Sequence, residues 1–229
     1  GPFVNSVKML LREDGVFVEE SHYIVDLVSK MEYDSIYAEH LRYYSLKSLV
    51  SLFENFGMEV FDAERIPNHG GSLRVYACIK GSRKVLGNVF KILREEEKDG
   101  FYSKEKYFLF AKKVLENREK LRQMLFGEKK AGKSIVGIGA PAKGNTLLNY
   151  CQIDGSVIDC LFEKQEMKIG RYSPGMHIKI LDEKELFITQ PDYALILSWN
   201  LKDFIARKLK EKGFLGKFIV PIPQPQIIG

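Results

Sequence analysis

Residues 135–150 read IVGIGAPAKGNTLLNY: a short apolar run, a turn with two close glycines, and then a helical pattern. The stretch from Gly137 to Ala142 fits the loose spacing G-x-G-x-x-G/A, in which glycine lets the backbone approach a phosphate closely. Free N–H groups at the start of the following helix attract an anion. The stretch therefore predicts a strand, a tight turn and a helix, with a phosphate-bearing ligand at the turn.

Three side chains near this turn bear on what it holds. Glu163 follows Gly139 by 24 residues, near the end of the next expected strand, where a ribose-binding acid would lie. By pattern alone this favours a dinucleotide such as NAD. Pro141 removes one N–H donor from the turn, whereas Lys143 adds a point charge that suits a phosphate. The alternative is a tight turn that binds nothing.

Strands and helices alternate after the turn. We expect strands over 135–138, 157–162, 193–197 and 218–220, and helices over 146–151 and 201–212, with Asn200 as the cap of the second helix. Buried β-rich runs that alternate with helices are typical of a parallel α/β sheet. The polar, glycine-bearing stretch 126–133 marks a domain boundary.

The first 126 residues follow a different order. Apolar spacing predicts helices over 3–11, from Ser45 to Gly57, over 85–93 and over 104–126. Strands are expected over 16–18, 58–66 and 73–79, and residues 67–71 would join the last two as a hairpin loop.

A second motif, Tyr37-Ala38-Glu39-His40, sets a phenol, a carboxylate and an imidazole within four residues. These groups suit proton transfer, because histidine titrates near neutral pH. In an extended segment Tyr37 and Glu39 would share a side, with His40 opposite. A turn would let all three converge, and the sequence leaves both conformations open.

Composition excludes several classes of protein. The 229 residues are 45% apolar with a net charge of +5, and the basic residues form no stripe suited to a nucleic acid. No apolar run could span a membrane and no secretion signal is visible. The cysteines, Cys78, Cys151 and Cys160, are odd in number and match no metal-site spacing. We therefore expect a reducing, cytoplasmic location.

Further motifs stand in a fixed order along the chain. They are IYAEHLRYYS (36–45), HGGSLR (69–74), GIGAPAKGNTLLNY (137–150), GRYSPGMH (170–177), SWN (198–200) and KFIVPIP (217–223). Together they resemble the sugar C-methyltransferases, which methylate a carbon of nucleotide-linked keto-deoxysugars. The resemblance covers nearly the whole chain. Departures from the family pattern are Ala38, in place of a second histidine, the segment 163–166, and Ile169 and Gln152, in place of a usual glutamine and glycine.

The resemblance implies an α/β fold: a partial class I SAM-methyltransferase fold followed by a Rossmann-like, parallel-sheet C-terminal domain. Residues 1–81 would be the C-terminal remnant of the S-adenosylmethionine (SAM) domain, 82–131 a helical connector, and 132–229 the nucleotide-sugar-binding domain. The SAM site, and the cysteines of a zinc module, are expected before residue 1. We therefore expect an enzyme whose present chain is not competent alone.

The resemblance also implies roles for individual residues. His40 would be the general base, while Tyr37 and Glu39 bind sugar hydroxyls or polarise the ketone. Lys143 and Asn145 would hold the diphosphate. The remaining substrate-binding candidates are His69, Arg74, Arg171, Tyr172 and His177. For these five the structural alternatives stay open: a hairpin-loop histidine, a cross-strand partner for Arg74, and a loop that covers the sheet.

The expected partner is a nucleotide-diphosphate sugar, with no nucleic acid and no membrane. Two other functions remain open. One is a stand-alone nucleotide-sugar-binding module without catalysis. The other is an NAD-dependent oxidoreductase, which would rest on GIGAPA and Glu163.

Overall fold

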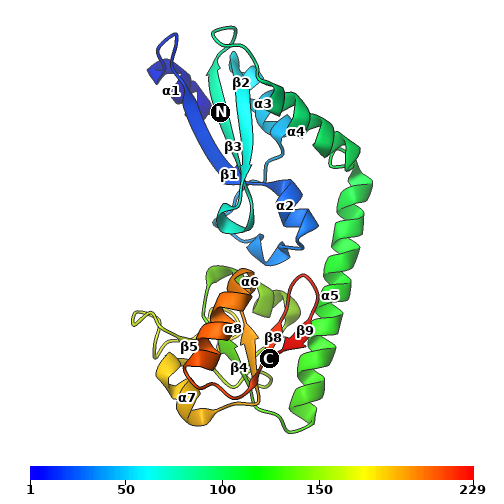
Figure 1. Cartoon of the computed structure of the whole chain (residues 1–229), viewed down its shortest axis with the longest axis vertical. Helices are drawn as coiled ribbons and strands as arrows, with labels where there is room; N and C mark the ends of the chain where they lie inside the picture. The colour runs from blue at the N-terminus through cyan, green and yellow to red at the C-terminus, as the bar shows by residue number, and fades with distance from the viewer. The chain divides into compact units, whose positions relative to one another are not determined.

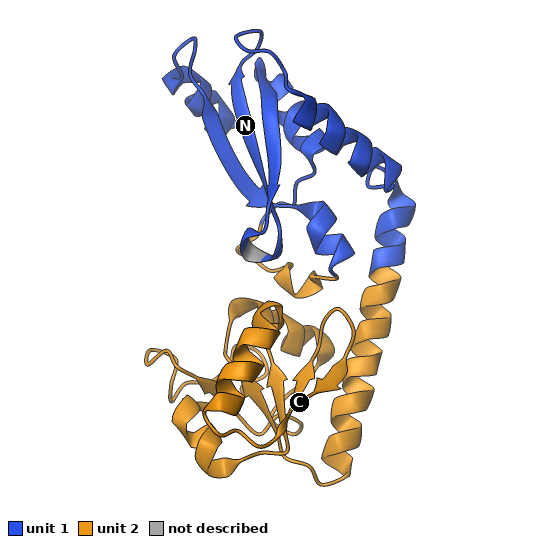
Figure 2. Cartoon of the chain, viewed as in Figure 1, with its two compact units in different colours: residues 1–30, 41–110 blue, residues 31–40, 111–229 orange. Residues whose placement is uncertain are grey.

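The computed structural model describes residues 1–68 and 70–229, and the chain divides into two compact units (Figure 2). Unit 1 comprises residues 1–30 and 41–110, and unit 2 comprises residues 31–40 and 111–229. The segment 31–40, with the motif from Tyr37 to His40, thus belongs to the same unit as the glycine-rich turn. The two motifs are far apart in the sequence, and this grouping is what makes a common site feasible.

Unit 1 combines helices with a small antiparallel sheet (Figure 1). Its elements are α1 (Pro2–Leu10), β1 (Phe17–His22), α2 (Ile24–Ser29), α3 (Leu46–Glu54), β2 (Met58–Ile66), β3 (Ser72–Ile79) and α4 (Gly87–Lys98). The strand order is β1-β3-β2, and both pairings are antiparallel. Helix α5 (Lys104–Lys130) begins in unit 1 and continues in unit 2.

Local sequence explains the start of α3 and the end of the hairpin loop. The Ser45 side chain accepts the N–H of Ser48, and the Ser48 side chain accepts that of Ser45, which completes a capping box. The prediction of Ser45 as N-cap is confirmed. At Gly71, φ is +150° and a Cβ atom would collide with the Asp26 side chain, so only glycine fits there.

A buried carboxylate ties α4 to α3. Glu96 is almost fully buried, and its oxygens accept hydrogen bonds from the Tyr23 hydroxyl (2.8 Å), the Tyr102 hydroxyl (2.8 Å) and the backbone N–H groups of Leu46 (2.6 Å) and Lys47 (3.2 Å). The negative charge therefore lies at the N-terminus of α3, where free N–H groups favour an anion.

Unit 2 is built on a six-stranded sheet of order β6-β5-β4-β7-β8-β9. Its elements are β4 (Ile135–Ile138), α6 (Ala142–Cys151), β5 (Leu161–Glu163), β6 (Ile180–Asp182), α7 (Leu186–Thr189), β7 (Tyr193–Ile196), α8 (Lys202–Glu211), β8 (Lys217–Val220) and β9 (Gln226–Ile228). All pairings are parallel except that between β8 and β9. Apolar side chains of α7 and α8 pack on the central strands. The prediction of an α/β chain with a mostly parallel sheet is confirmed.

Several expected elements differ in the structure. The strand expected over 157–162 begins only at Leu161 and ends at Glu163. Its first residues are not extended, because the N–H groups of Val157 and Ile158 both bond to the carbonyl of Asp154 and form a turn. Asn200 does not cap α8, since it lies in a 3-10 turn and accepts a hydrogen bond from Lys143 instead. The strand at 217–220 is followed by the unexpected β9.

Two helices also differ from expectation. Helix α4 begins at Gly87, so Val85 and Leu86, which we expected on its apolar face, precede the helix. Phe90, expected on the same face, is 52% exposed. Helix α5 continues to Lys130, so most of the polar stretch where we expected a domain boundary is helical. Throughout the described part of the chain, the helices are too short or too polar to cross a membrane.

Candidate functional site

The glycine-rich turn follows β4 at the carboxyl edge of the parallel sheet, the edge at which such sheets bind ligands. Gly139 has a φ of +80°, a left-handed conformation that favours glycine. A Cβ atom on Gly144 would lie 2.9 Å from that of Leu197, so α6 approaches the sheet closely only because position 144 is a glycine. These two glycines are thus explained by the turn and by packing, before any ligand is considered.

Glu163 is engaged by the turn itself. Its carboxylate accepts the backbone N–H groups of Ala140 (2.9 Å), Lys164 (2.7 Å) and Gln165 (3.3 Å). Burial raises the pKa of Glu163, but these hydrogen bonds and the charge of Lys168 outweigh it, so the net shift is downward. The acid that the pattern matched to a ribose holds the backbone of the turn in this structure.

The start of α6 remains suited to an anion. Its N-cap is Pro141, and among the described residues no side chain caps the helix. A separate cavity of about 120 Å³ lies beside Gly139 at the carboxyl edge of the sheet, and among the described residues its lining takes none from α6. Its lining includes Gly139, Glu163, Lys164, Glu183, Ser198 and Lys208.

Lys143 lies on the first turn of α6. Its ammonium donates a hydrogen bond to Oδ1 of Asn200 and lies 4.9 Å from the centroid of the Trp199 ring. Burial lowers the pKa of Lys143, and the charges of Asp34 and Glu32 oppose that shift. A partly desolvated ammonium beside a helix N-terminus is a strong attractor for a phosphate.

Asp34 is a residue of this site that sequence reasoning missed. It lies in the 3-10 turn Tyr33–Ser35, is fully buried, and accepts the indole N–H of Trp199 at 2.7 Å. Burial raises the pKa of Asp34 to about 6, against the lowering effects of that hydrogen bond and of Lys143. The available signal was weak: an aspartate three residues before Tyr37, and a lone tryptophan 165 residues away.

Tyr37 and His40 are brought together by a turn. The N–H of His40 bonds to the carbonyl of Tyr37 (3.0 Å), and Nε2 of His40 lies 3.1 Å from the Tyr37 hydroxyl. Burial, with the charges of Glu39 and Asp34, raises the pKa of Tyr37, so its phenol stays protonated at neutral pH. Of the two conformations left open by the sequence, the structure has the turn. Glu39 is exposed beside the pair.

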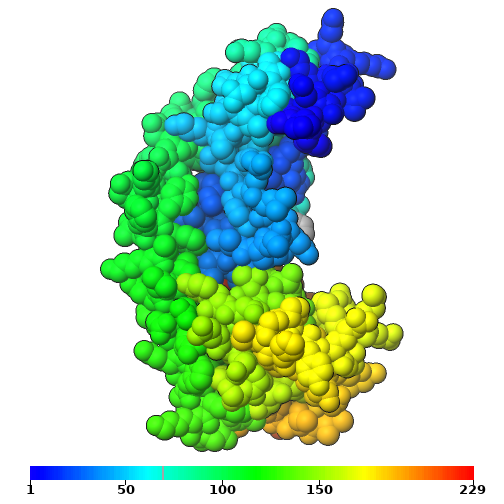
Figure 3. All heavy atoms as spheres, turned by 180° about the vertical axis from the view of Figure 1, so that it is seen from behind, coloured from blue at the N-terminus to red at the C-terminus, as the bar shows by residue number. Residues whose placement is uncertain are grey.

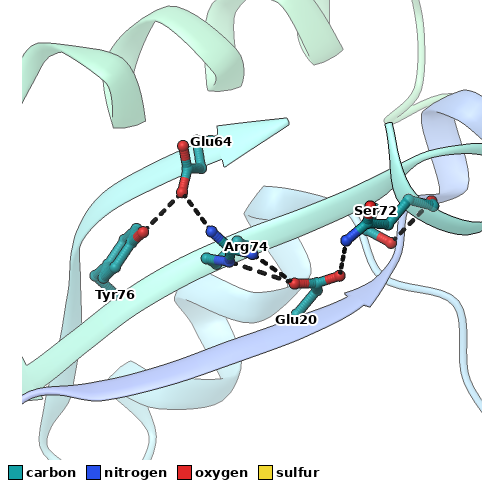
Figure 4. Close-up of polar contacts among 6 residues, drawn as sticks. Glu20, Glu64, Ser72, Arg74 and Tyr76 are labelled. Carbon is teal, nitrogen blue, oxygen red and sulfur yellow. Dashed lines mark hydrogen bonds and ion pairs between the residues drawn. The ribbon is translucent and has the colours of Figure 1, made fainter. Parts of the chain in front are cut away.

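Arg74 lies in unit 1 and is held between two carboxylates (Figure 4). Its guanidinium pairs with Glu20 on β1 at 3.0 Å and with Glu64 on β2 at 3.1 Å, and Glu64 also accepts the hydroxyl of Tyr76. These are cross-strand contacts of the antiparallel sheet. They favour the cross-strand role for Arg74. The neighbouring candidate, His69, lies outside the described residues.

The remaining candidates lie in unit 2. Arg171, Tyr172 and His177 are exposed on the loop between β5 and β6, part of the yellow surface in the space-filling view (Figure 3). Asn145 lies on α6, and its Oδ1 atom is buried with no hydrogen-bond partner among the described residues. Among all residues that the structure describes, no three metal-ligating side chains cluster as a metal site would require.

Comparison with known proteins defines the class. Residues 67–223 match the family model described as "C-methyltransferase C-terminal domain". The chain belongs to this family.

A particular relative is the C-methyltransferase NovU of Streptomyces niveus, 36% identical over 229 residues. The match covers 98% of this chain but 54% of NovU, so the chain spans about half the length of that relative. Among solved structures, glutamyl-tRNA reductase from Methanopyrus kandleri is 12% identical over 81% of this chain and 59% of that chain. The TM-score of that comparison is 0.22.

Proposed function

We propose that this protein is the C-terminal portion of a SAM-dependent C-methyltransferase that acts on a nucleotide-diphosphate-linked keto-deoxysugar through an enolate. The observation that carries the proposal is the contact of Tyr37 with His40 at 3.1 Å, in the unit that also contains Lys143 at a helix N-terminus. The Tyr37–His40 pair supplies acid–base chemistry, and Lys143 at the helix N-terminus supplies an anion site. Membership of the C-methyltransferase family supports joining the two.

In this proposal His40 removes a proton from the carbon next to the ketone. The C–H electron pair forms the new C=C bond, and the π electron pair of the carbonyl moves to the ketone oxygen, which gives the enolate. Tyr37, whose pKa is raised, keeps its proton and donates a hydrogen bond to that oxygen. The base role therefore falls to the imidazole, and Glu39 is available to a sugar hydroxyl. His40 later releases the proton to water.

The methyl group comes from SAM in this class of enzyme. The described residues of unit 1 form a three-stranded antiparallel sheet, which lacks the glycine-rich strand–turn–helix of a SAM site. We therefore propose that SAM binds to residues outside this sequence and that unit 1 completes the methyltransferase fold. The sheet of unit 2 would act as the Rossmann-like module that holds the nucleotide sugar through Lys143 and Asn145.

Two alternatives make different demands on the structure. A stand-alone binding module needs the anion site but gives no use for the Tyr37–His40 pair. An NAD-dependent oxidoreductase needs Glu163 for a ribose, yet that carboxylate accepts three backbone N–H groups of its own turn. Both observations favour the methyltransferase.

Deuterium exchange tests the base role directly. The protein would be incubated in D₂O, without SAM, with a thymidine-diphosphate-linked keto-deoxysugar. Exchange of the α-hydrogen would be followed by mass spectrometry. We expect His40→Ala to slow exchange by ~10²–10⁴-fold, the usual contribution of a general base. The control Lys184→Ala, on a side chain 89% exposed, should exchange as the wild type does. Wild-type exchange in His40→Ala would remove His40 from this role.

A further inference from the structure

Asp34 is a buried carboxylate that the proposed chemistry leaves unused. It is fully buried, and one oxygen, Oδ2, accepts the Trp199 indole N–H at 2.7 Å. The other oxygen, Oδ1, is also buried and has no hydrogen-bond partner among the described residues. Such a group costs folding free energy. Stability alone therefore gives no reason for a carboxylate at this position.

Trp199 connects this carboxylate to Lys143. The edge of the indole ring is bound to Asp34, and its face lies 4.9 Å from the Lys143 ammonium. The same ammonium donates to Oδ1 of Asn200, the next residue along the chain. Because the N–H bond to Asp34 fixes the plane of the ring, it also fixes the surface over which the ammonium lies.

Charge couples the two ends of this connection. Burial disfavours the charged form of Lys143, and the negative charges of Asp34 and Glu32 offset that effect. Reciprocally, Lys143 favours the ionised form of Asp34, while Glu32 disfavours it. The charge of Asp34 is thus set first by burial, and then by the Trp199 N–H, Lys143, Glu32 and the backbone N–H of Asp34 itself.

We propose that Asp34 is a positioning residue that fixes the direction of the Lys143 ammonium through Trp199 and supplies a negative charge near it, so that the ammonium is held ready for an anionic phosphate group. The inference rests on the proposed role of Lys143 as a phosphate ligand. The proposal also explains why Asp34 and Tyr37 lie only three residues apart in the sequence. The same segment that carries the acid–base pair would set the charge of the diphosphate site.

The first test needs no ligand. The side-chain titration of Lys143 would be followed by NMR in the wild type and in Asp34→Asn, which keeps the size and a carbonyl acceptor but removes the charge. We expect the pKa of Lys143 to fall in the variant, and that of Lys184 to stay constant. An unchanged pKa of Lys143 would overturn the proposal.

The reciprocal variant covers the case in which Asp34→Asn does not fold. Lys143→Ala shortens a half-buried side chain on the first turn of α6, and we expect it to raise the pKa of the Asp34 carboxyl, measured by ¹³C NMR. An unchanged Asp34 would contradict the coupling. The control Lys184→Ala should leave Asp34 as it is.

A binding measurement tests the consequence for a ligand. We expect Asp34→Asn to weaken thymidine diphosphate about tenfold by calorimetry, the effect of losing roughly one charge-assisted contact. The affinity for thymidine, which lacks phosphate, should stay the same. Equal weakening of both would indicate a merely structural role. A different result would separate the two proposals. If Lys143→Ala bound thymidine diphosphate normally, while Asp34→Asn still lowered the pKa of Lys143, the phosphate role of Lys143 would fail and its coupling to Asp34 would stand.

Discussion

Among single residues, Asp34 gives a signature that depends on pH. Its pKa in the folded chain is about 6, above the unfolded value of about 3.9. Between these values the folded state binds more protons than the unfolded state, so stability falls as pH rises from about 4 to about 6. A shift of this size corresponds to about 3 kcal/mol.

The comparison with Asp34→Asn isolates that effect, because asparagine does not titrate. We expect the wild type to lose up to about 3 kcal/mol of stability relative to the variant between pH 4 and pH 7. Urea unfolding followed by the fluorescence of Trp199, the single tryptophan of the chain, measures the difference. A difference independent of pH would mean that Asp34 titrates normally.

The candidate site illustrates what sequence can and cannot predict for individual residues. Contact between Tyr37 and His40 was one of two conformations that the sequence left open, because three residues of separation allow contact only in a turn, and the structure has the turn. Asp34 and Trp199 were not predicted as partners, because 165 residues separate them and only the fold brings them together. Asn200 is a good N-cap by residue type, but the nearby Lys143 ammonium takes its side-chain oxygen instead.

Among the helices, α3 depends on a charge supplied by α4. Glu96 accepts four hydrogen bonds at 1% exposure, two of them from the first turn of α3. Glu96→Gln would place amide hydrogens against groups that already donate. We expect a loss of roughly 3 kcal/mol of stability, measured by thermal or urea unfolding.

Glu97→Gln is the matched control for that prediction. Glu97 is the next residue on α4 and is exposed, so the same substitution should change stability by less than about 0.5 kcal/mol. Equal effects at Glu96 and Glu97 would contradict the capping role of Glu96.

Helix α6 depends on Gly144. A Cβ atom there would lie 2.9 Å from the Cβ of Leu197 and 3.2 Å from the ring of Pro141, so backbone must move to admit it. We expect Gly144→Ala to destabilise unit 2 by about 1–3 kcal/mol, the usual cost of overpacking. Gly127→Ala on α5 meets nothing within 4 Å and should be neutral or stabilise by up to about 1 kcal/mol. The same sign of change at both positions would refute the packing argument.

Most elements of the fold followed from local sequence. The paired strands β2 and β3, the capped start of α3 and the alternation around the glycine-rich turn all carry strong short-range signals. The apolar run at 157–162 misled because a buried turn and a buried strand share the same composition. Strand β9 was missed because prolines 221, 223 and 225 suppress a strand signal immediately before it.

At the scale of the whole molecule, the grouping of residues 31–40 with 111–229 is the feature that sequence could not give. It assigns the motif from Tyr37 to His40 to the unit that holds the glycine-rich turn. We therefore propose that unit 2 holds the phosphate of a nucleotide sugar and offers a base to that sugar. If so, this chain, as it is, binds the nucleotide.

Calorimetric titration of this chain with thymidine diphosphate, alongside NAD and SAM, is the decisive test of these two roles. We expect binding of thymidine diphosphate, weakened at least tenfold by Lys143→Ala and unchanged by Lys184→Ala, with no binding of NAD or SAM. Binding of NAD without thymidine diphosphate would contradict this proposal and favour an oxidoreductase. Binding of none of the three would contradict the claim that unit 2 carries a complete nucleotide site.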